Sequence, residues 1–393
     1  MKIALKWIVV CCGLITTFNS ASAQNWTMTS APSNHWYSVA SSADGTKLAA
    51  VANNSLPTLS GQIYVSTNSG TFWTLSGAPD TNWISIASSA DGTKLVAAFV
   101  VPQGGQVYTS SNSGTSWKLT SAPNTNWHCV ASSADGNKIV AVALGGPICT
   151  STNSGEDWAT AAVPSNRWAS VACSADGNTL VAVVSPGSIY TSTDSGANWI
   201  AGPDGTWFCS ASSVDGTKLA VGGYDTNAAS AIYVSTNSGM TWKPTSAPSV
   251  PSWGSLAFSA DGADFIASGY PGPIYSSKDL GESWLSNSAP IGLWSSVRSS
   301  ADGHKSVTVA WNGPIYTSQS TPSPLLNILY SNNNLALSWT LPSTNFTLQQ
   351  NWDLSAPNWV TISNKPILNL TNLQNEVFLP PPASKSFYRL VSP

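Results

Sequence analysis

Side chains that could carry acid–base chemistry are few in this sequence, and many of its carboxylates fall in one repeated turn. Only 8% of the 393 residues are charged, with 18 aspartates and glutamates. Seven of the aspartates precede glycine at regular intervals, which predicts hairpin turns. Six other acids remain as candidates for catalysis, namely Glu156, Asp157, Asp204, Asp225, Asp264 and Glu282. Hydrolysis of a glycosidic bond would need two of them about 5–10 Å apart in one cleft.

No nucleophile, metal or phosphate motif accompanies these acids. The histidines, His35, His128 and His304, fall on repeat positions where we expect surface residues. No phosphate-binding loop or metal-ligand spacing is present. Cys129, Cys149, Cys173 and Cys209 follow the N-terminal segment, and their repeat positions predict buried thiols rather than a disulfide framework. The sequence therefore predicts no cofactor and no metal.

Seven copies of one unit run through residues 24–320 and must position any site. Six copies carry a Ser-x-Asx-x-Gly-x-x-Trp box, at Ser66–Trp73, Ser110–Trp117, Ser151–Trp158, Ser192–Trp199, Ser235–Trp242 and Ser277–Trp284. Each unit also carries an inner tryptophan, at Trp36, Trp83, Trp127, Trp168, Trp207, Trp253 and Trp294. An Asp-Gly pair follows, at Asp44, Asp91, Asp135, Asp176, Asp215, Asp261 and Asp302. A period of 39–47 residues with strand and turn patterns predicts an all-β, seven-bladed β-propeller.

The boxes resemble the Asp-box (BNR) repeat of sialidases, sortilin-type receptors, xyloglucanases and photosystem II assembly factors. The resemblance covers about three quarters of the chain, and it implies the propeller fold more strongly than any activity, because enzymes and non-enzymes share the repeat. Sialidases hold the substrate carboxylate with three arginines. This chain has Arg167, Arg298 and Arg389, and the last lies outside the repeats, so sialidase activity is not expected. The resembling xyloglucanases use two facing propellers, and this chain has one.

The order of segments in a unit predicts four strands to a blade. In the first unit they begin near Trp36, Lys47, Gln62 and Trp73. The last unit ends without a box, whereas the segment Asn25–Thr27 resembles an outer strand with no unit before it. We therefore expect the N-terminal strand to complete the last blade, since ring closure removes exposed sheet edges.

The boxes have a structural explanation that needs no metal. Their Asx side chains are Asn68, Asn112, Asn153, Asp194, Asn237 and Asp279. We expect each to accept a hydrogen bond from a backbone N–H two residues on, the glycine to adopt positive φ, and the tryptophan to pack. Four of the six are asparagine, a poorer calcium ligand than aspartate, and each stands alone.

Loop lengths distinguish the two faces of the predicted disc. The Asp-Gly turns and the boxes share one face, the box face, and keep one length throughout. On the opposite face, the variable face, loops of blades one, two and five are longer by six, three and four residues. Loops on a rigid scaffold often carry recognition. We therefore predict ligand contacts at Asn53, Asn54, Tyr224, Asp225 and Asn227, with neutral drift of surface loops as the alternative.

The inner tryptophans begin their strands beside the variable face. Trp36 and Trp83 could offer indole surfaces to sugars or peptide side chains. The alternative is packing between blades, which is common for a large residue repeated once per blade.

Both ends of the chain differ from the repeats. Residues 1–23 read as a signal peptide, with basic residues, a short apolar run and an Ala-Ser-Ala cleavage pattern. Residues 321–324 read as a Pro/Ser linker, and residues 325–393 as a small C-terminal β-sandwich-like module, similar to immunoglobulin or fibronectin domains. The chain is therefore expected to be secreted, periplasmic or on the cell surface, with no transmembrane segment in the mature protein.

The amino-acid composition limits the classes of molecule that this protein is expected to bind. The net charge is −3 and no basic patch is evident, which argues against nucleic acid. A surface rich in serine, threonine and asparagine suits recognition by hydrogen bonds, although it also suits a protein that is merely soluble. We favour a secreted, non-catalytic binding or scaffold protein that recognises a protein or glycan through the variable face. A glycan-active enzyme of glycoside hydrolase type and a structural envelope or matrix protein are the alternatives.

Overall fold

The described chain consists of β-strands joined by turns. The computed structural model describes residues 25–53, 61–320, 326–331, 334–340, 347–353, 358–369, 374–380 and 386–391. Within these residues all elements are strands, and no helix is long and apolar enough to cross a membrane. The predicted signal peptide and linker lie outside them.

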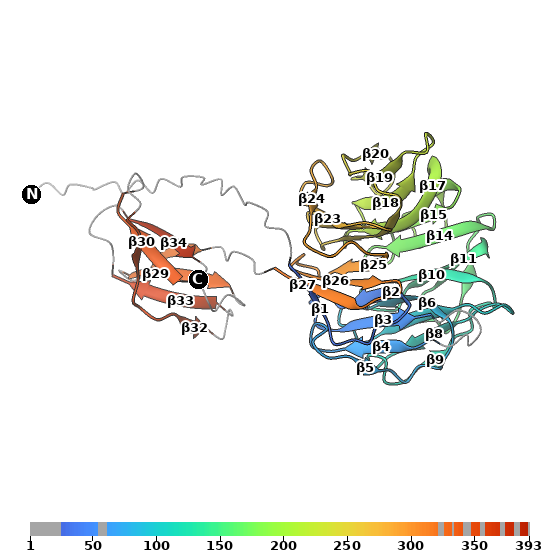
Figure 1. Cartoon of the computed structure of the whole chain (residues 1–393), viewed down its shortest axis with the longest axis horizontal. Helices are drawn as coiled ribbons and strands as arrows, with labels where there is room; N and C mark the ends of the chain where they lie inside the picture. Colours follow the sequence, from blue (N-terminus) through green and yellow to red (C-terminus); the bar gives the residue numbers. More distant parts are fainter. Residues whose placement is uncertain are drawn as a thin grey trace, which may run out of the picture.

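Seven antiparallel blades follow one another around a ring (Figure 1). Blade one comprises β2 (Trp36–Ser41), β3 (Leu48–Ala52), β4 (Ile63–Ser66) and β5 (Thr74–Leu75). Blade two comprises β6 (Trp83–Ser88), β7 (Leu95–Phe99), β8 (Val107–Ser110) and β9 (Lys118–Leu119). Blade three comprises β10 (Trp127–Ser132), β11 (Ile139–Gly146), β12 (Ile148–Ser151) and β13 (Ala159–Thr160).

Blades four and five share one long strand. Blade four comprises β14 (Asn166–Cys173), β15 (Leu180–Val184), β16 (Gly187–Ser192) and the start of β17 (Ile200–Ser212). Blade five comprises the rest of β17, β18 (Leu219–Tyr224), β19 (Ser230–Ser235) and β20 (Lys243–Pro244). The strand is continuous because the connection before Trp207 is two residues shorter than the usual one, so the outer strand of one blade runs directly into the inner strand of the next.

The N-terminal strand closes the ring, as the boxless last unit predicts. Blade six comprises β21 (Trp253–Phe258), β22 (Phe265–Gly269), β23 (Ile274–Ser277) and β24 (Leu285–Ser286). Blade seven comprises β25 (Trp294–Ser299), β26 (Lys305–Ala310), β27 (Ile315–Gln319) and, as its outer strand, β1 (Trp26–Met28). In this pairing Trp26 lies opposite Ser318 and Met28 opposite Tyr316.

Each interface between blades is filled by apolar side chains from both. Between blades one and two, for example, Val51 and Ile63 pack with Trp83 and Ile86, all at most 1% exposed. The Trp83 indole also donates a hydrogen bond of 3.1 Å to the carbonyl of Pro79. Alanine and valine dominate the second strands, such as Leu48–Ala52, because those strands are buried on both faces.

The C-terminal module has its own two sheets and its own core, and its strands do not pair with the described propeller strands (Figure 1). One sheet comprises β28 (Asn327–Ser331), β29 (Asn334–Thr340), β33 (Gln374–Leu379) and β32 (Ile367–Asn369). The other comprises β31 (Val360–Thr361), β30 (Thr347–Asn351) and β34 (Phe387–Val391). Leu337, Trp339, Leu348 and Val377 form the centre of the core. The sequence pattern predicts five strands in this module and misses β28 and β32. The five predicted ranges are Leu335–Thr340, Phe346–Gln350, Trp359–Ile362, Glu376–Leu379 and Phe387–Val391.

Candidate functional site

Hydrogen bonds that repeat from blade to blade stabilise the turns of the box face. In the first box, Asn68 Oδ1 accepts from the Ser66 hydroxyl at 2.9 Å and from the Phe72 N–H at 2.9 Å. All six boxes show the bond to the N–H four residues on, rather than two as the sequence suggests. Two successive residues with positive φ, such as Ser69 at 56° and Gly70 at 84°, cause the longer reach.

The box indoles are fixed by the same turn. In each box the tryptophan Nε1 donates to the carbonyl of the box glycine, as Trp73 does to Gly70 at 3.1 Å. The Asx oxygens are therefore occupied by bonds inside the box. Among the described residues, no three His, Cys, Asp or Glu side chains come together as a metal site would require.

The Asp-Gly turns of this face hold their carboxylates in the ionised form. The Asp91 carboxylate accepts from the Ser89 hydroxyl at 2.6 Å and from the Thr93 N–H at 2.9 Å. These hydrogen bonds, the one from Ser89 above all, lower the pKa of Asp91 to about 2. The remaining six turn aspartates also have lowered pKa values. Their role is therefore structural, as the repeat suggests.

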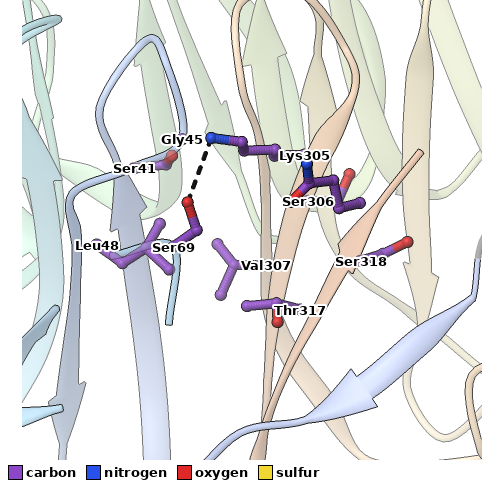
Figure 2. A pocket seen from close by; sticks show the side chains of 10 residues that line it. Ser41, Gly45, Leu48, Ser69, Lys305, Ser306, Val307, Thr317 and Ser318 are labelled. Carbon is purple, nitrogen blue, oxygen red and sulfur yellow. Dashed lines mark hydrogen bonds between the residues drawn. The ribbon is translucent and has the colours of Figure 1, made fainter. Parts of the chain in front are cut away.

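Lysines three residues after the Asp-Gly aspartate link neighbouring blades across this face. Lys94 Nζ donates to Asn137 Oδ1 at 2.6 Å and to Ser154 Oγ at 3.3 Å, both in blade three. Lys305 in blade seven reaches Ser69 in blade one at 3.2 Å, above a cavity of about 40 Å³ that Leu48 and Thr317 also line (Figure 2). So small a cavity has room for about one water, and no larger ligand.

The variable face differs because a β-bulge follows the inner tryptophan in all seven blades. The bulged residues are Tyr37, Ile84, His128, Ala169, Phe208, Gly254 and Ser295, and all of them line the central channel. A bulge redirects one side chain out of the strand alternation. This ring therefore forms part of the channel wall next to the buried tryptophans. Burial lowers the pKa of His128, which favours its neutral form.

Four of the predicted ligand contacts lie in the long loops of blades one and five. Asn53 is only 4% exposed, and its N–H donates to the carbonyl of His35 at 2.9 Å. Asn54 lies outside the described residues. Asp225 organises the tip of the blade-five loop, where its Oδ1 accepts from the N–H groups of Asn227 at 2.8 Å and Ala229 at 3.0 Å, and this leaves Asn227 exposed.

Trp36 and Trp83 do not reach the surface. Both are 0% exposed, as are Trp127, Trp168 and Trp207. Trp36 meets the ring of Tyr64 edge-on at 5.5 Å, and Trp83 meets Tyr108 in the same way at 5.6 Å. Trp36 and Trp83 are therefore not available for ligand contacts, because each indole is completely buried by packing between blades.

Tyr224 instead belongs to a set of aromatic side chains that span blades five, six, seven and one on the variable face. We call this set the aromatic arc, and it consists of Phe208, Tyr224, Tyr270, Trp311 and Tyr37, all half-buried. Phe208 and Tyr224 meet edge-on at 5.6 Å, and Tyr37 meets Trp311 at 4.8 Å. Burial, and then its neighbour Tyr270, raises the pKa of Tyr37. Tyr224, Tyr270 and Trp311 each stand 17 residues after their blade's inner tryptophan, which is the sequence signal that could have identified them.

The central channel beside the arc is a cavity of about 370 Å³, walled by residues of the seven inner strands. Four residues after the inner tryptophan, six blades place an alanine in this wall, namely Ala40, Ala87, Ala131, Ala172, Ala211 and Ala257. Blade seven places Arg298 there. Alignment of the seven units could have revealed this exception. Arg167, by contrast, is exposed at the start of β14.

The candidate acids are engaged in local contacts. Glu156 and Glu282 form exposed ion pairs with Lys118 and Lys243, at 3.7 Å and 2.8 Å. Asp157 and Asp204 accept hydrogen bonds, from Asn153 at 2.8 Å and Ser188 at 2.5 Å. Asp264 lies on the box face, where burial raises its pKa. No acidic residue is among the described side chains that line the channel.

The four cysteines among the described residues are free thiols. Cys149 and Cys209 are buried as the sequence suggests, whereas Cys129 and Cys173 are half-buried. Cys129, Cys173 and Cys209 all lie in the channel wall.

The similarity of this chain to known proteins lies in its three-dimensional structure. No protein-family model matches the sequence, and no curated protein matches it. The structure is similar to a GH74 xyloglucanase from Xanthomonas campestris, with a TM-score of 0.57 and 17% identity, over 81% of this chain and 59% of that one. It is similar to YCF48 bound to D1 peptide, with a TM-score of 0.56 and 13% identity, over 76% of this chain and 98% of that one. It is also similar to YCF48 from Cyanidioschyzon merolae, with a TM-score of 0.56 and 14% identity, over 76% of this chain and 99% of that one.

These similarities agree with the repeat. The chain spans less than two thirds of the xyloglucanase and nearly all of YCF48. Its single ring of seven blades, its six boxes and its structural neighbours together give this chain the fold of the Asp-box (BNR), sialidase-like propellers.

Proposed function

We propose that this protein is a non-catalytic binding protein, exported from the cytoplasm, that recognises a protein or a glycan through the aromatic arc on its variable face. One observation carries the proposal. Five half-buried aromatic side chains from four successive blades gather on the face whose loops vary in length. Aromatic rings with polar tips offer flat apolar surface together with hydrogen-bonding groups, which suits sugars and peptide side chains alike.

The scaffold supports this role. The box face is held by repeated hydrogen bonds and lysine contacts, so the inner strands form a rigid base for the arc. The Tyr224 hydroxyl donates to the carbonyl of Pro251, which holds its ring at the blade-five edge. A ring that is already held in place loses little conformational entropy when a ligand binds. One structural neighbour, YCF48, was solved with a peptide bound, which supports peptide binding as a use of this fold.

The test is a ligand screen followed by matched aromatic substitutions. The mature protein is screened on a glycan array and against peptides displayed in a library. Each hit is then measured by calorimetry with Trp311→Ala and Tyr224→Ala. We expect each substitution to weaken binding roughly 10- to 100-fold, as loss of an aromatic anchor does.

Phe72→Ala is the control. Phe72 is 62% exposed in the first box, on the opposite face, so the same chemical change there should leave affinity unaltered. Hits that lose affinity with Phe72→Ala but keep it with both arc variants would place binding elsewhere and refute the proposal.

A further inference from the structure

Arg298 places a large cation at a level of the channel where the other six blades place a methyl group. The remaining described residues of the wall are mainly serine, alanine and apolar side chains, with one histidine and three cysteines. A residue that departs from a sevenfold repeat at the axis of the ring does not serve the packing that the repeat itself provides.

The guanidinium of Arg298 is only partly satisfied by the protein. Its Nη1 donates to the carbonyl of Val297 at 2.7 Å and to the Ser255 hydroxyl at 3.3 Å. No acceptor for Nε or Nη2 is found among the described residues, and the ion pairs found there all involve lysine. Since a guanidinium keeps its charge at any physiological pH, the wall holds a positive charge that no described residue neutralises as a counter-ion.

No carboxylate stands among the described residues of the wall to supply the missing negative charge. The thiols of Cys129 and Cys209 are close enough to Arg298 to interact with it electrostatically. Burial raises the pKa of Cys209 to about 12, so that thiol is neutral at physiological pH. The other polar groups of the wall are mostly hydroxyls, such as Ser170 and Ser210, which are 2.9 Å apart. Hydroxyl and guanidinium donors together match the acceptors of an oxyanion.

We propose that the central channel is an oxyanion site in which Arg298 binds one carboxylate, sulfate or phosphate group. The group is either a free ion or the carboxylate of a larger molecule that enters the channel. The cavity, at about 370 Å³, has room for such a group together with water. This site does not depend on the ligand of the aromatic arc.

Binding is measured on the full mature chain by calorimetry and by the melting temperature at constant ionic strength. Acetate is compared with acetamide, and sulfate with chloride. Glucuronate is compared with glucose to test a carboxylate carried on a larger molecule. We expect saturable binding of one oxyanion per chain and no binding of acetamide or glucose. Binding of acetate and sulfate but not of glucuronate would identify a free ion as the ligand. Binding of glucuronate alone would identify a carboxylate carried on a larger molecule.

Arg298→Ala is the decisive variant because it gives blade seven the residue of the other six. It is expected to fold, with an unchanged circular dichroism spectrum, and to lose oxyanion binding at least tenfold. Arg298→Lys keeps the charge without the planar fork and should bind about tenfold more weakly. Arg167→Ala, which removes an exposed arginine, should bind as the wild type does. Equal anion effects in the wild type and Arg298→Ala would show a general salt effect and overturn the site. Trp311→Ala should leave this binding intact, which separates the test from that of the proposed function.

Discussion

The backbone N–H of Ala301 donates a hydrogen bond of 2.6 Å to the carbonyl of Ala43, although 258 residues separate them. It is the last of seven such bonds, one for each pair of adjacent blades, and all are 2.6–3.0 Å long. The donors are Ala43, Ala90, Ala134, Ala175, Val214, Ala260 and Ala301. The Asp-Gly turn of each blade is thus hydrogen-bonded to that of the next blade. On the box face these backbone bonds close the ring, in addition to the closure that β1 provides.

Loss of the closing strand should destabilise the propeller. Trp26 packs against the cluster formed by Ala257, Ile274 and Trp294. We expect Trp26→Ala to reduce the free energy of unfolding by about 2 kcal/mol, less than truncation of a fully buried tryptophan costs, because Trp26 is half-buried. Urea unfolding followed by tryptophan fluorescence measures this. Met28→Ala in the same strand removes a side chain that is 62% exposed and should cost little. Equal effects of the two changes would mean that β1 does not act through its packing.

The box glycine should not accept a side chain. Gly155 has φ at +88°, and a Cβ added there would lie 2.8 Å from Thr120 Cγ2. We expect Gly155→Val to cost roughly 1–3 kcal/mol of stability, since a β-branched residue resists positive φ. Denaturant titration of the purified variant measures the cost, and a wild-type midpoint would contradict the assigned conformation.

The box asparagine should act by hydrogen bonds alone. Asn153 Oδ1 accepts from Ser151 at 3.0 Å and from the Asp157 N–H at 2.9 Å. Asn153→Ala should therefore cost about 1 kcal/mol, and a chelator should not change the melting temperature of the wild type. A large drop with chelator would mean that the boxes hold a metal ion.

Stability should fall in acid through the turn aspartates. Their folded pKa values lie below the unfolded value of about 3.9, so the stabilisation is complete above that pH. It is lost as the pH falls toward about 2, the value for Asp91. Melting curves between pH 2 and 7 should show this decline, and Asp91→Asn should make it shallower. A melting temperature that is constant down to pH 2 would contradict the prediction, although exposure of these groups keeps each contribution small.

Two thiols of the channel wall, those of Cys173 and Cys209, should react slowly in the native protein. Burial raises the pKa of Cys173 and of Cys209 to about 12, and the thiolate is the reactive form. At pH 8 iodoacetamide should therefore label both slowly, and rapidly once urea unfolds the chain. Mass spectrometry of tryptic peptides measures the two rates, and fast labelling of the folded protein would show that the inner strands open readily.

Several parts of the site escaped the sequence pattern for reasons that can be named. The pattern assumes strict strand alternation, whereas a bulge after each inner tryptophan, as between Trp36 and Ser38, shifts the register. The place of Trp36 and Trp83 beside the variable face suggested ligand contact, with packing between blades as the alternative, and the structure shows the packing. The bulge instead turns Tyr37 and Phe208, which the pattern did not single out, toward the channel. In the module, β28 and β32 were missed because Asn327–Ser331 and Ile367–Asn369 are short segments without clear alternation.

The sequence by itself determined the seven blades, their strand order and closure by the N-terminal strand, because each depends on local turn chemistry repeated around a ring. Only the tertiary structure decided which side chains meet. Tyr37 of blade one and Trp311 of blade seven come together because ring closure makes their blades neighbours. Phe208 meets Tyr224 within blade five, where the bulge after Trp207 redirects the Phe208 side chain. The position of Arg298 in the sequence shows a departure from alanine. Only the walls that seven inner strands build around the channel show that no described acidic side chain faces it there.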